Sequence, residues 1–435
     1  MSTTKLYQSD VYIKEWTTVI CDVAADLNGK PALHLKETAF FPEGGGQSCD
    51  LGTISVTLSG YSEPLLIDVI DVQEDGDDVI HAIALAGKYS QAETDEILAA
   101  LPGASVSCAL DWDRRFDNMQ RHCGEHILSG IFYQECGGVN RGFHMGDDYM
   151  TIDISLEDEP TNPEATKPSE ITHELAQRCE LLANRVIWSN APVTVMRFGS
   201  REEIENLPLR KALAFDEDIS IVCVGSVENA ADCVACCGTH PSTAGQVGLL
   251  KIYKVENYKG MFRVYFEAGQ RALEDYVLKH EILTSLSNRY SSSVEDFPGK
   301  IRAQEDKLAA AKNELFHIKK ALMQIECTNL DALLADKPGV ALYQLKDFSM
   351  DDAFNMAKEY MGTERCGGNL ILLYSMPATS YVLVSDGSIN CGSLVKEYAS
   401  FYNGKGGGSA VSARAIFTND EDAALFADLI KKLLR

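Results

Sequence analysis

Two pairs of metal-binding side chains, distant in the sequence, constrain the fold of this chain more than any other feature. His122 and His126 are four residues apart, and Cys236 and His240 repeat that spacing far downstream. Residues four apart on a helix point to the same side, so the two imidazoles can face one ion. A thiolate and an imidazole from a second segment complete a His₃Cys set, which suits Zn²⁺. If one ion takes all four, the two segments must meet.

The local pattern differs between the two pairs. Apolar residues recur every three or four positions across residues 116–131, which predicts a helix that carries the histidine pair. Gly238 and Pro241 predict a loop for the second pair. Cys233 and Cys237 are nearby thiols that are either alternative ligands or bystanders.

Two other interpretations fit these residues. Each pair can be an accident of spacing, because one histidine pair at helical spacing is a weak signal. Residues 122–126 (HCGEH) also match the H-x-x-E-H pattern of inverted zinc peptidases, in which Glu125 would be the general base. The peptidase interpretation gives no role to Cys236 and His240.

Composition limits the classes of protein that this chain can represent. Its 435 residues predict two to four domains, with 45% hydrophobic and 24% charged residues as in ordinary globular proteins. We find no apolar run of about 18 residues and no secretory signal, so no membrane association is expected. Thirteen cysteines scattered along a long chain favour reduced thiols and a cytoplasmic protein. The net charge of −25 argues against a broad basic face, so any RNA contact must be local.

The hydrophobic patterns predict an α+β fold with four parts. Residues 1–108 contain short strand patterns separated by turn signals, which predict a β-rich, barrel-like domain. Residues 109–270 mix helix and strand patterns, as expected for a two-layer α/β domain around the metal ligands. Residues 271–330 are helical in character, and residues 331–435 alternate strand and helix patterns as a small α/β domain does.

The helical part carries a heptad seam. Two rows of residues lie seven positions apart, namely Ile301, Leu308, Leu315 and Leu322, and Ala311, Ile318 and Ile325. This spacing is typical of a coiled-coil contact. The contact is expected either within one helical arm or with a second copy of the chain, and a homodimer through the arm or the C-terminal domain is one outcome.

Three segments in this order resemble one family. They are FFPEGGGQSCDLG at 40–52, RRFDNMQRHCGEHILSG at 114–130 and CCGTHPSTAGQVGLLKI at 236–252. The order is similar to the editing domain of alanyl-tRNA synthetase and its free-standing AlaX-type relatives, which carry a Gly-Gly-Gln loop, an H-x-x-x-H helix and a C-x-x-x-H loop. The resemblance continues through a helical arm to a glycine cluster at 406–408, in a region that looks like a DHHA1 domain.

The resemblance implies a hydrolase that removes the wrong amino acid from tRNA(Ala). Serine is the main substrate implied, and glycine is the second. A synthetic site for alanine cannot strongly reject glycine or an isostere with one added hydroxyl, so a second, hydrolytic site is required. With no room for an adenylate-forming domain before the glycine loop, we expect a trans-editing enzyme and no aminoacylation. A non-catalytic protein of the same fold that binds zinc and tRNA is the alternative.

The resemblance also assigns roles to individual residues. The implied Zn²⁺ ligands are His122, His126, Cys236 and His240, and the implied substrate contacts are Gly44, Gly45, Gly46, Gln47 and Thr239. Glu125 is a candidate to orient water, and the candidate tRNA contacts are Arg114, Arg115, Arg121, Gly406, Gly407 and Gly408. Four bound side chains would close the coordination shell, which normally marks a structural zinc. Catalysis then requires either a loosely held ligand or a water that does not touch the metal.

Overall fold

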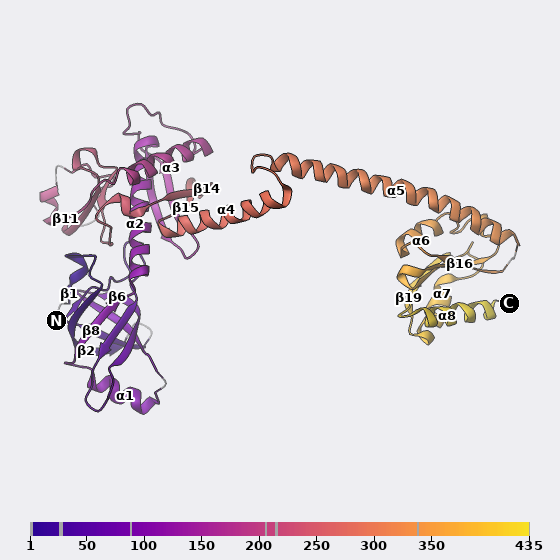
Figure 1. Cartoon of the computed structure of the whole chain (residues 1–435), viewed down its shortest axis with the longest axis horizontal. Coiled ribbons are helices and arrows are strands. Elements are labelled where there is room, and N and C mark those ends of the chain that lie inside the picture. Colours follow the sequence, from indigo (N-terminus) through magenta and orange to yellow (C-terminus); the bar gives the residue numbers. More distant parts are fainter. Residues whose placement is uncertain are drawn as a thin grey trace. The chain divides into compact units, whose positions relative to one another are not determined.

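The computed structural model describes residues 3–25, 29–87, 89–204, 207–213, 216–336 and 339–434. Contacts divide the chain into two compact units, Met1–Leu286 and Ser287–Arg435, whose elements are labelled in Figure 1. The four-part division stays a prediction within this coarser one. No helix among the described residues is long and apolar enough to cross a membrane.

The first unit begins with a closed barrel, which confirms the barrel-like domain expected there. Its strand order is β2-β3-β7-β6-β5-β8. The strands are β2 (Glu15–Ala25), β3 (Pro31–Leu35), β5 (Gly52–Val56), β6 (Leu65–Asp75), β7 (Asp78–Leu85) and β8 (Ser105–Leu110). Alternate side chains such as Ile54, Val56 and Ile67 point inward and are buried, as the period of a strand requires.

Shorter elements complete the barrel region. Strands β1 (Thr4–Lys5) and β4 (Glu37–Thr38) pair in parallel. Helix α1 (Gln91–Ala100) lies between β7 and β8 and starts at a capping box made by Ser90 and Glu93. The strand patterns alone gave no helix in this region.

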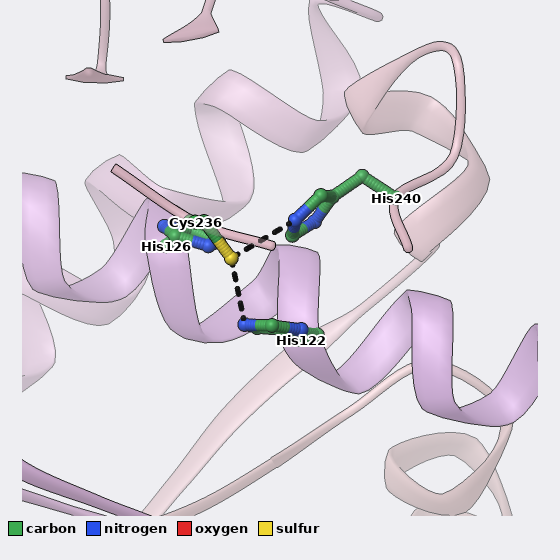
Figure 2. A group of neighbouring side chains, drawn as sticks. All are labelled: His122, His126, Cys236 and His240. Carbon is green, nitrogen blue, oxygen red and sulfur yellow. Dashed lines mark hydrogen bonds between the residues drawn. The ribbon is translucent and has the colours of Figure 1, made fainter. Parts of the chain in front are cut away.

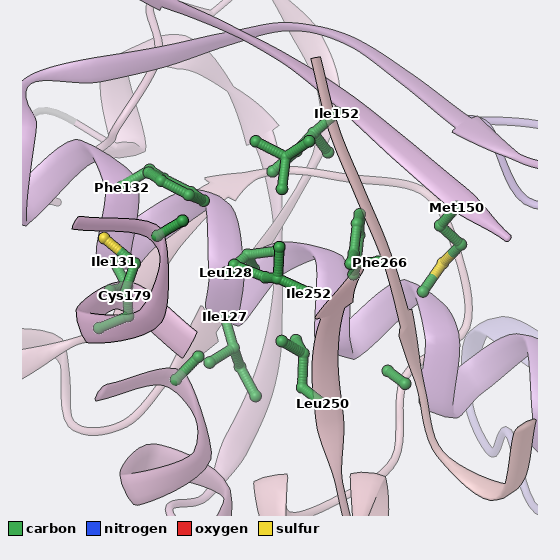
Figure 3. Close-up of a cluster of buried hydrophobic side chains, with 14 of the residues drawn as sticks. Ile127, Leu128, Ile131, Phe132, Met150, Ile152, Cys179, Leu250, Ile252 and Phe266 are labelled. Carbon is green, nitrogen blue, oxygen red and sulfur yellow. The ribbon is translucent and has the colours of Figure 1, made fainter. Parts of the chain in front are cut away.

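Helix α2 (Trp112–Cys136) leaves the barrel directly after β8. The carboxylate of Asp111 caps its first turn, and Gly137 ends it in a left-handed conformation. The helix packs on a four-stranded sheet of order β14-β15-β10-β9, from β9 (Gly138–Met145), β10 (Met150–Leu156), β14 (Leu250–Tyr258) and β15 (Met261–Ala268). Figure 3 shows Ile127 and Leu128 of α2 in the core between this sheet and α3 (His173–Trp188).

A separate three-stranded sheet leads into the second metal-binding segment. Its order is β11 (Val193–Ser200), β12 (Glu217–Val224) and β13 (Asp232–Ala235). Cys223 and Cys233 lie opposite each other on β12 and β13 and form a disulfide, whereas the composition favoured reduced thiols. The short helix η4 (Ala244–Val247) then precedes β14.

Two long helices follow β15. Helix α4 (Gln270–Tyr290) belongs mainly to the first unit, and α5 (Phe297–Asp336) belongs to the second. Pro298 lies in the first turn of α5, where its missing N–H costs nothing. The heptad side chains are exposed; Leu308 and Leu315, for example, are 55% and 53% exposed. Coiled-coil pairing therefore stays a prediction.

The second unit ends in a five-stranded sheet of order β16-β17-β18-β20-β19. Its elements are β16 (Val340–Leu345), α6 (Met350–Ala357), β17 (Leu370–Ser375), β18 (Ser380–Val384), α7 (Cys391–Tyr398), β19 (Lys405–Gly408), β20 (Ser412–Ile416) and α8 (Asp420–Leu433). Strand β17 is buried on both faces, with Ile371 in one core and Leu372 in the other. This arrangement confirms the α/β pattern expected for the C-terminal region.

The glycine cluster forms the edge strand β19. A Cβ on Gly406 would lie 1.9 Å from the carbonyl oxygen of Arg414, and one on Gly408 would lie 2.3 Å from that of Ser412. These glycines allow close backbone packing against β20. Their contact with tRNA stays a prediction.

Candidate metal centre

The four predicted ligands meet in the first unit. Helix α2 places His122 and His126, and the loop after β13 places Cys236 and His240 (Figure 2). Their ligand atoms all lie within 4.8 Å of one another. The Cys236 sulfur lies 3.5 Å from Nε2 of His122 and 3.4 Å from Nε2 of His240. All three imidazoles are buried, so the cluster lies at the edge of the core.

Two glycines let the segments approach this closely. A Cβ on Gly238 would lie 2.3 Å from Cε1 of His122, so only glycine lets the loop pass under that ring. A Cβ on Gly130 of α2 would lie 2.0 Å from the carbonyl oxygen of Ala231, just before β13. The loop predicted from Gly238 and Pro241 thus packs closely against the His122 ring, and the segment before β13 packs closely against α2.

Two of the histidines are held through the nitrogen that faces away from the cluster. Nδ1 of His126 lies 3.0 Å from Oδ2 of Asp232, and Nδ1 of His122 lies 2.9 Å from Oε1 of Gln47. An acceptor on Nδ1 keeps the proton there and leaves the lone pair of Nε2 for a metal. Nε2 of His126 is buried and has no hydrogen-bond partner among the described residues. The donor set therefore fits a Zn²⁺ ion.

Asp232 and Arg210, which the sequence analysis did not identify, extend this arrangement. Arg210 donates from Nε to Oδ1 of Asp232 over 2.6 Å and from Nη2 to Oδ2 over 3.0 Å. Both side chains are buried. The carboxylate that orients His126 is thus itself held by a bidentate ion pair.

Gln47 is fully buried and bridges the glycine loop to the ligands. Its Nε2 donates to the Thr239 hydroxyl over 2.8 Å, and its Oε1 accepts from the Thr239 N–H over 3.0 Å as well as facing His122. The resemblance implied that this amide contacts the substrate. The structure instead gives it protein partners, and the substrate contacts of Gln47 and Thr239 stay predictions.

The glycine loop itself is a tight turn closed by hydrogen bonds between Gly44 and Gln47. Gly45 and Gly46 have φ values of +62° and +84°, which side chains rarely adopt. A Cβ on Gly46 would also lie 2.6 Å from the ring of Phe143. The turn keeps bare backbone beside the cluster, as a backbone contact with a ligand would require.

The electrostatics of the cluster favour a thiolate. Burial opposes its ionisation, but the surrounding imidazoles of His122, His240 and His126 hold the pKa of Cys236 well below its usual value. Burial lowers the pKa of His240 to about 4, which keeps that ring neutral. Burial also disfavours a charged His126, yet the Cys236 thiolate and Asp232 raise its pKa to about 10. Metal uptake would therefore displace a proton from this group of side chains.

A cavity of about 520 Å³ lies beside the cluster and is lined by Gly45, His122, His126, Cys236 and Glu125, among others. Glu125 is 5% exposed. Its Oε1 accepts hydrogen bonds from the Ser129 hydroxyl over 2.6 Å and from Nδ2 of Asn140 over 2.7 Å. Its position is compatible with orienting water, which stays a prediction.

The arginines around the cluster form hydrogen bonds or ion pairs with the protein itself. Arg115 is fully buried, and its Nε donates to Asp50 over 2.9 Å. Arg121 is 2% exposed and pairs with Glu267 over 2.8 Å. Neither guanidinium reaches the surface, and the contact of these two residues with tRNA stays a prediction. Arg114 is half-buried and donates to the Cys49 carbonyl, so its contact with tRNA stays a prediction.

The chain is similar in sequence to known proteins. Residues 337–435 match the DHHA1 domain. The chain is 26% identical to the alanyl-tRNA editing protein AlaX-L of Pyrococcus horikoshii, over 94% of this chain and 93% of that protein. It is 29% identical to the alanyl-tRNA editing protein AlaX-M of Methanosarcina acetivorans, over 60% of this chain and 97% of that protein.

A third relative is much longer than this chain. The alanine–tRNA ligase of Pyrococcus abyssi is 26% identical over 99% of this chain, but the match spans 44% of the ligase. The matched part of that ligase thus corresponds to the barrel, the metal cluster, the helices and the C-terminal sheet. The chain is thus similar to the AlaX-L editing protein along nearly its whole length and to the AlaX-M editing protein over 60% of its length, and its residues 337–435 match the DHHA1 domain.

Proposed function

We propose that this chain is a zinc-dependent deacylase that hydrolyses mischarged tRNA(Ala) in trans. The substrates are Ser-tRNA(Ala) and, second, Gly-tRNA(Ala), and the chain does not aminoacylate tRNA. The observation that carries the proposal is the His₃Cys cluster beside a cavity and the glycine loop. The similarity to proteins named for alanyl-tRNA editing supports it. Because tRNA is the substrate, we expect the protein in the cytoplasm.

We assign separate roles in the reaction to the metal, to Glu125 and to the glycine loop. When bound, Zn²⁺ supplies a positive centre that either lowers the pKa of a water or holds the amino or hydroxyl group of the substrate. Glu125, fixed through Oε1 by Ser129 and Asn140, is placed to accept a proton from the attacking water. The bare backbone at Gly45 and Gly46 leaves space for the terminal adenosine to approach.

Selectivity requires a polar group in the site that forms a hydrogen bond with the serine hydroxyl and stays unpaired when alanine is bound. A site that hydrogen-bonds a substrate hydroxyl discriminates strongly against the analogue that lacks it, because the buried polar group is left unpaired. Correctly charged Ala-tRNA(Ala) would thus be spared.

The test is a deacylation assay with Ser-, Gly- and Ala-charged tRNA(Ala). We expect serine to be released faster than glycine, and both faster than alanine. His126→Ala should abolish the activity, whereas the matched variant His173→Ala, at an exposed position of α3, should retain it. Serine release no faster than in buffer, or no faster than that of alanine, would sink the proposal. Intact metal and tRNA binding without turnover would instead favour the non-catalytic alternative.

The structure gives the peptidase alternative little support. That interpretation needs only residues 122–126, yet Cys236 and His240 complete the same cluster. It also predicts that Cys236→Ser keeps full activity against a protein substrate. A loss of metal in that variant, with no peptidase activity in the parent, would exclude it.

We also propose that the heptad seam of α5 pairs with the same seam of a second copy. The aliphatic side chains of the seam, Ile301, Leu308, Leu315, Ile318, Leu322 and Ile325, are between 43% and 56% exposed. A regular row of exposed aliphatic residues on a helix is the surface that a parallel or antiparallel partner helix covers.

A further inference from the structure

The three histidines of the metal cluster differ in what holds their outward nitrogen. His126 is held most firmly, because Nδ1 faces the carboxylate of Asp232 at 3.0 Å. Asp232 is 3% exposed and is clamped by two hydrogen bonds from Arg210, which is 8% exposed. A buried carboxylate needs such a partner, since an isolated buried charge is costly.

His122 is held less firmly, because its Nδ1 faces a neutral amide. The Oε1 atom of Gln47 that accepts this contact at 2.9 Å also accepts the Thr239 N–H at 3.0 Å. The ring is still confined, since it lies on α2 and stacks on Phe143 with centroids 5.7 Å apart. Its neighbour His126 stacks on it with centroids 5.0 Å apart.

His240 has no such support. Its Nε2 faces the Cys236 sulfur at 3.4 Å. Its Nδ1 is buried and, within the part of the chain that the structure describes, has no hydrogen-bond partner. The residue lies in the loop after β13, whereas the other two histidines lie within one regular helix.

These contacts rank the ligands. A histidine that binds metal usually donates its second N–H to a carboxylate, a carbonyl or water, and removing this partner typically weakens metal binding about 10–100-fold. A carboxylate raises the basicity of the ring more than an amide does. We propose that Asp232 and Arg210 are positioning residues that make His126 the anchor of the metal, and that His240 is the ligand that leaves to open a coordination position.

The ranking explains how a zinc ion with four protein ligands could still have an open coordination position. A closed set normally marks a structural metal, whereas a catalytic site keeps one position open. With His126, His122 and Cys236 retained, three protein ligands remain, which is the number typical of catalytic zinc sites. Only this use of the open position rests on the proposed function; the ranking itself concerns metal binding alone.

Metal affinity tests the ranking without tRNA. Metal-free protein is titrated with Zn²⁺ against a competing chelator, and with Co²⁺ to follow the thiolate-to-metal absorption. We expect Asp232→Asn and Arg210→Met to weaken Zn²⁺ binding about 10–100-fold. His240→Ala should weaken it about tenfold or less and keep the thiolate absorption, whereas His126→Ala should lose both. A loss in His240→Ala as large as in His126→Ala would overturn the proposal, as would unchanged affinity in Asp232→Asn.

Added imidazole separates ligand loss from misfolding. In Co²⁺-loaded His240→Ala, free imidazole should occupy the vacated position and restore the wild-type spectrum, and it should not do so in His126→Ala. No response in His240→Ala would contradict an open position there. Tryptophan fluorescence of each metal-free variant shows whether the first unit is folded. Asp232→Glu, which keeps a carboxylate, should bind Zn²⁺ more tightly than Asp232→Asn. A chain that binds metal in this order but releases no serine would refute the proposed function and leave the ranking standing.

Discussion

Helix α2 buries charged side chains, whereas helix α5 exposes aliphatic ones, and each departs from the usual rule that apolar residues lie inside. On α2 the buried polar residues are Arg115, Asn118, Arg121, His122, Glu125, His126, Ser129 and Glu135. On α5 the exposed aliphatic residues recur along the heptad seam. Both helices are long, and both show a helical period of apolar residues in the sequence. The period alone therefore does not tell which helix is buried and which is exposed.

The difference lies in where each helix finds its partners. Arg115 pairs with Asp50 of the barrel region, Arg121 with Glu267 of β15, and His126 with Asp232 of β13. These three charged or polar residues of α2 therefore find partners within the first unit. The aliphatic residues of the α5 seam are exposed within the second unit, and we propose that a second copy of the chain covers them. Buried charge on α2 surrounds the metal cluster, and we propose that the exposed aliphatic surface on α5 forms an interface.

The largest effect is expected at the seam of α5. Leu308→Glu combined with Leu315→Glu places charges in the proposed contact of both copies. Burial of one leucine contributes about 1.5–3 kcal/mol, so losing four should raise the dissociation constant of the dimer about ten-thousandfold or more. Sedimentation analysis should show a dimer for the wild type and a monomer for the variant.

The matched control keeps the spacing but uses the outer face of the same helix. Ala310→Glu with His317→Glu adds the same charge at exposed positions seven residues apart and should leave the dimer intact. A wild-type chain that is monomeric at high concentration would break the comparison, because the seam would then have no partner copy.

The next largest effect is expected in the buried ion pair of α2. Arg115→Met leaves Asp50 buried without its partner, so the free energy of unfolding should fall by about 3–5 kcal/mol. Urea unfolding followed by tryptophan fluorescence measures this, because all three tryptophans lie in the first unit. Arg185→Met at an exposed position of α3 should stay within about 0.5 kcal/mol of the wild type. Adding Asp50→Leu to Arg115→Met should recover part of the loss; no loss in the single variant would contradict the burial of this pair.

A smaller effect separates packing from helix propensity. Gly130→Ala on α2 should destabilise the first unit by about 1–3 kcal/mol, because the added Cβ would lie 2.0 Å from the Ala231 carbonyl oxygen. Ala310→Gly on α5 should cost about 1 kcal/mol through propensity alone. Circular dichroism during thermal unfolding compares the two. If Gly130→Ala stabilises the protein, propensity outweighs the close approach and α2 is less tightly packed than the structure indicates.

Features that depend on a local period or a fixed spacing could be predicted from the sequence. The His122–His126 helix and the barrel strands follow from such patterns. The two ligand pairs were each found by their spacing of four, and the order of three segments joined them. Helix α1 was missed because its ten residues, Gln91–Ala100, bury only Ile97 and so carry almost no amphipathic signal.

Partners that come from distant segments could not be predicted. The burial of Arg115 and Arg121 is one example, because charged residues usually lie at the surface. Their acids are 65 and 146 positions away and belong to no motif. Asp232 and Arg210 were missed for the same reason: neither belongs to a motif, and only the fold brings Asp232 to His126 and Arg210 to Asp232.

The bridge from Gln47 to His122 and Thr239 has a consequence for how the first unit folds. Gln47 belongs to the loop between β4 and β5 of the barrel region, yet its amide contacts a ligand and the loop that follows Cys236. Metal occupancy and barrel stability are therefore thermodynamically linked, because an ion that binds the folded cluster also favours the barrel conformation that completes it. Linkage is reciprocal, so bound metal favours the folded barrel by the same factor by which unfolding of the barrel weakens metal binding. The barrel region thus affects the stability of the metal centre through Gln47, although it supplies none of the four ligands.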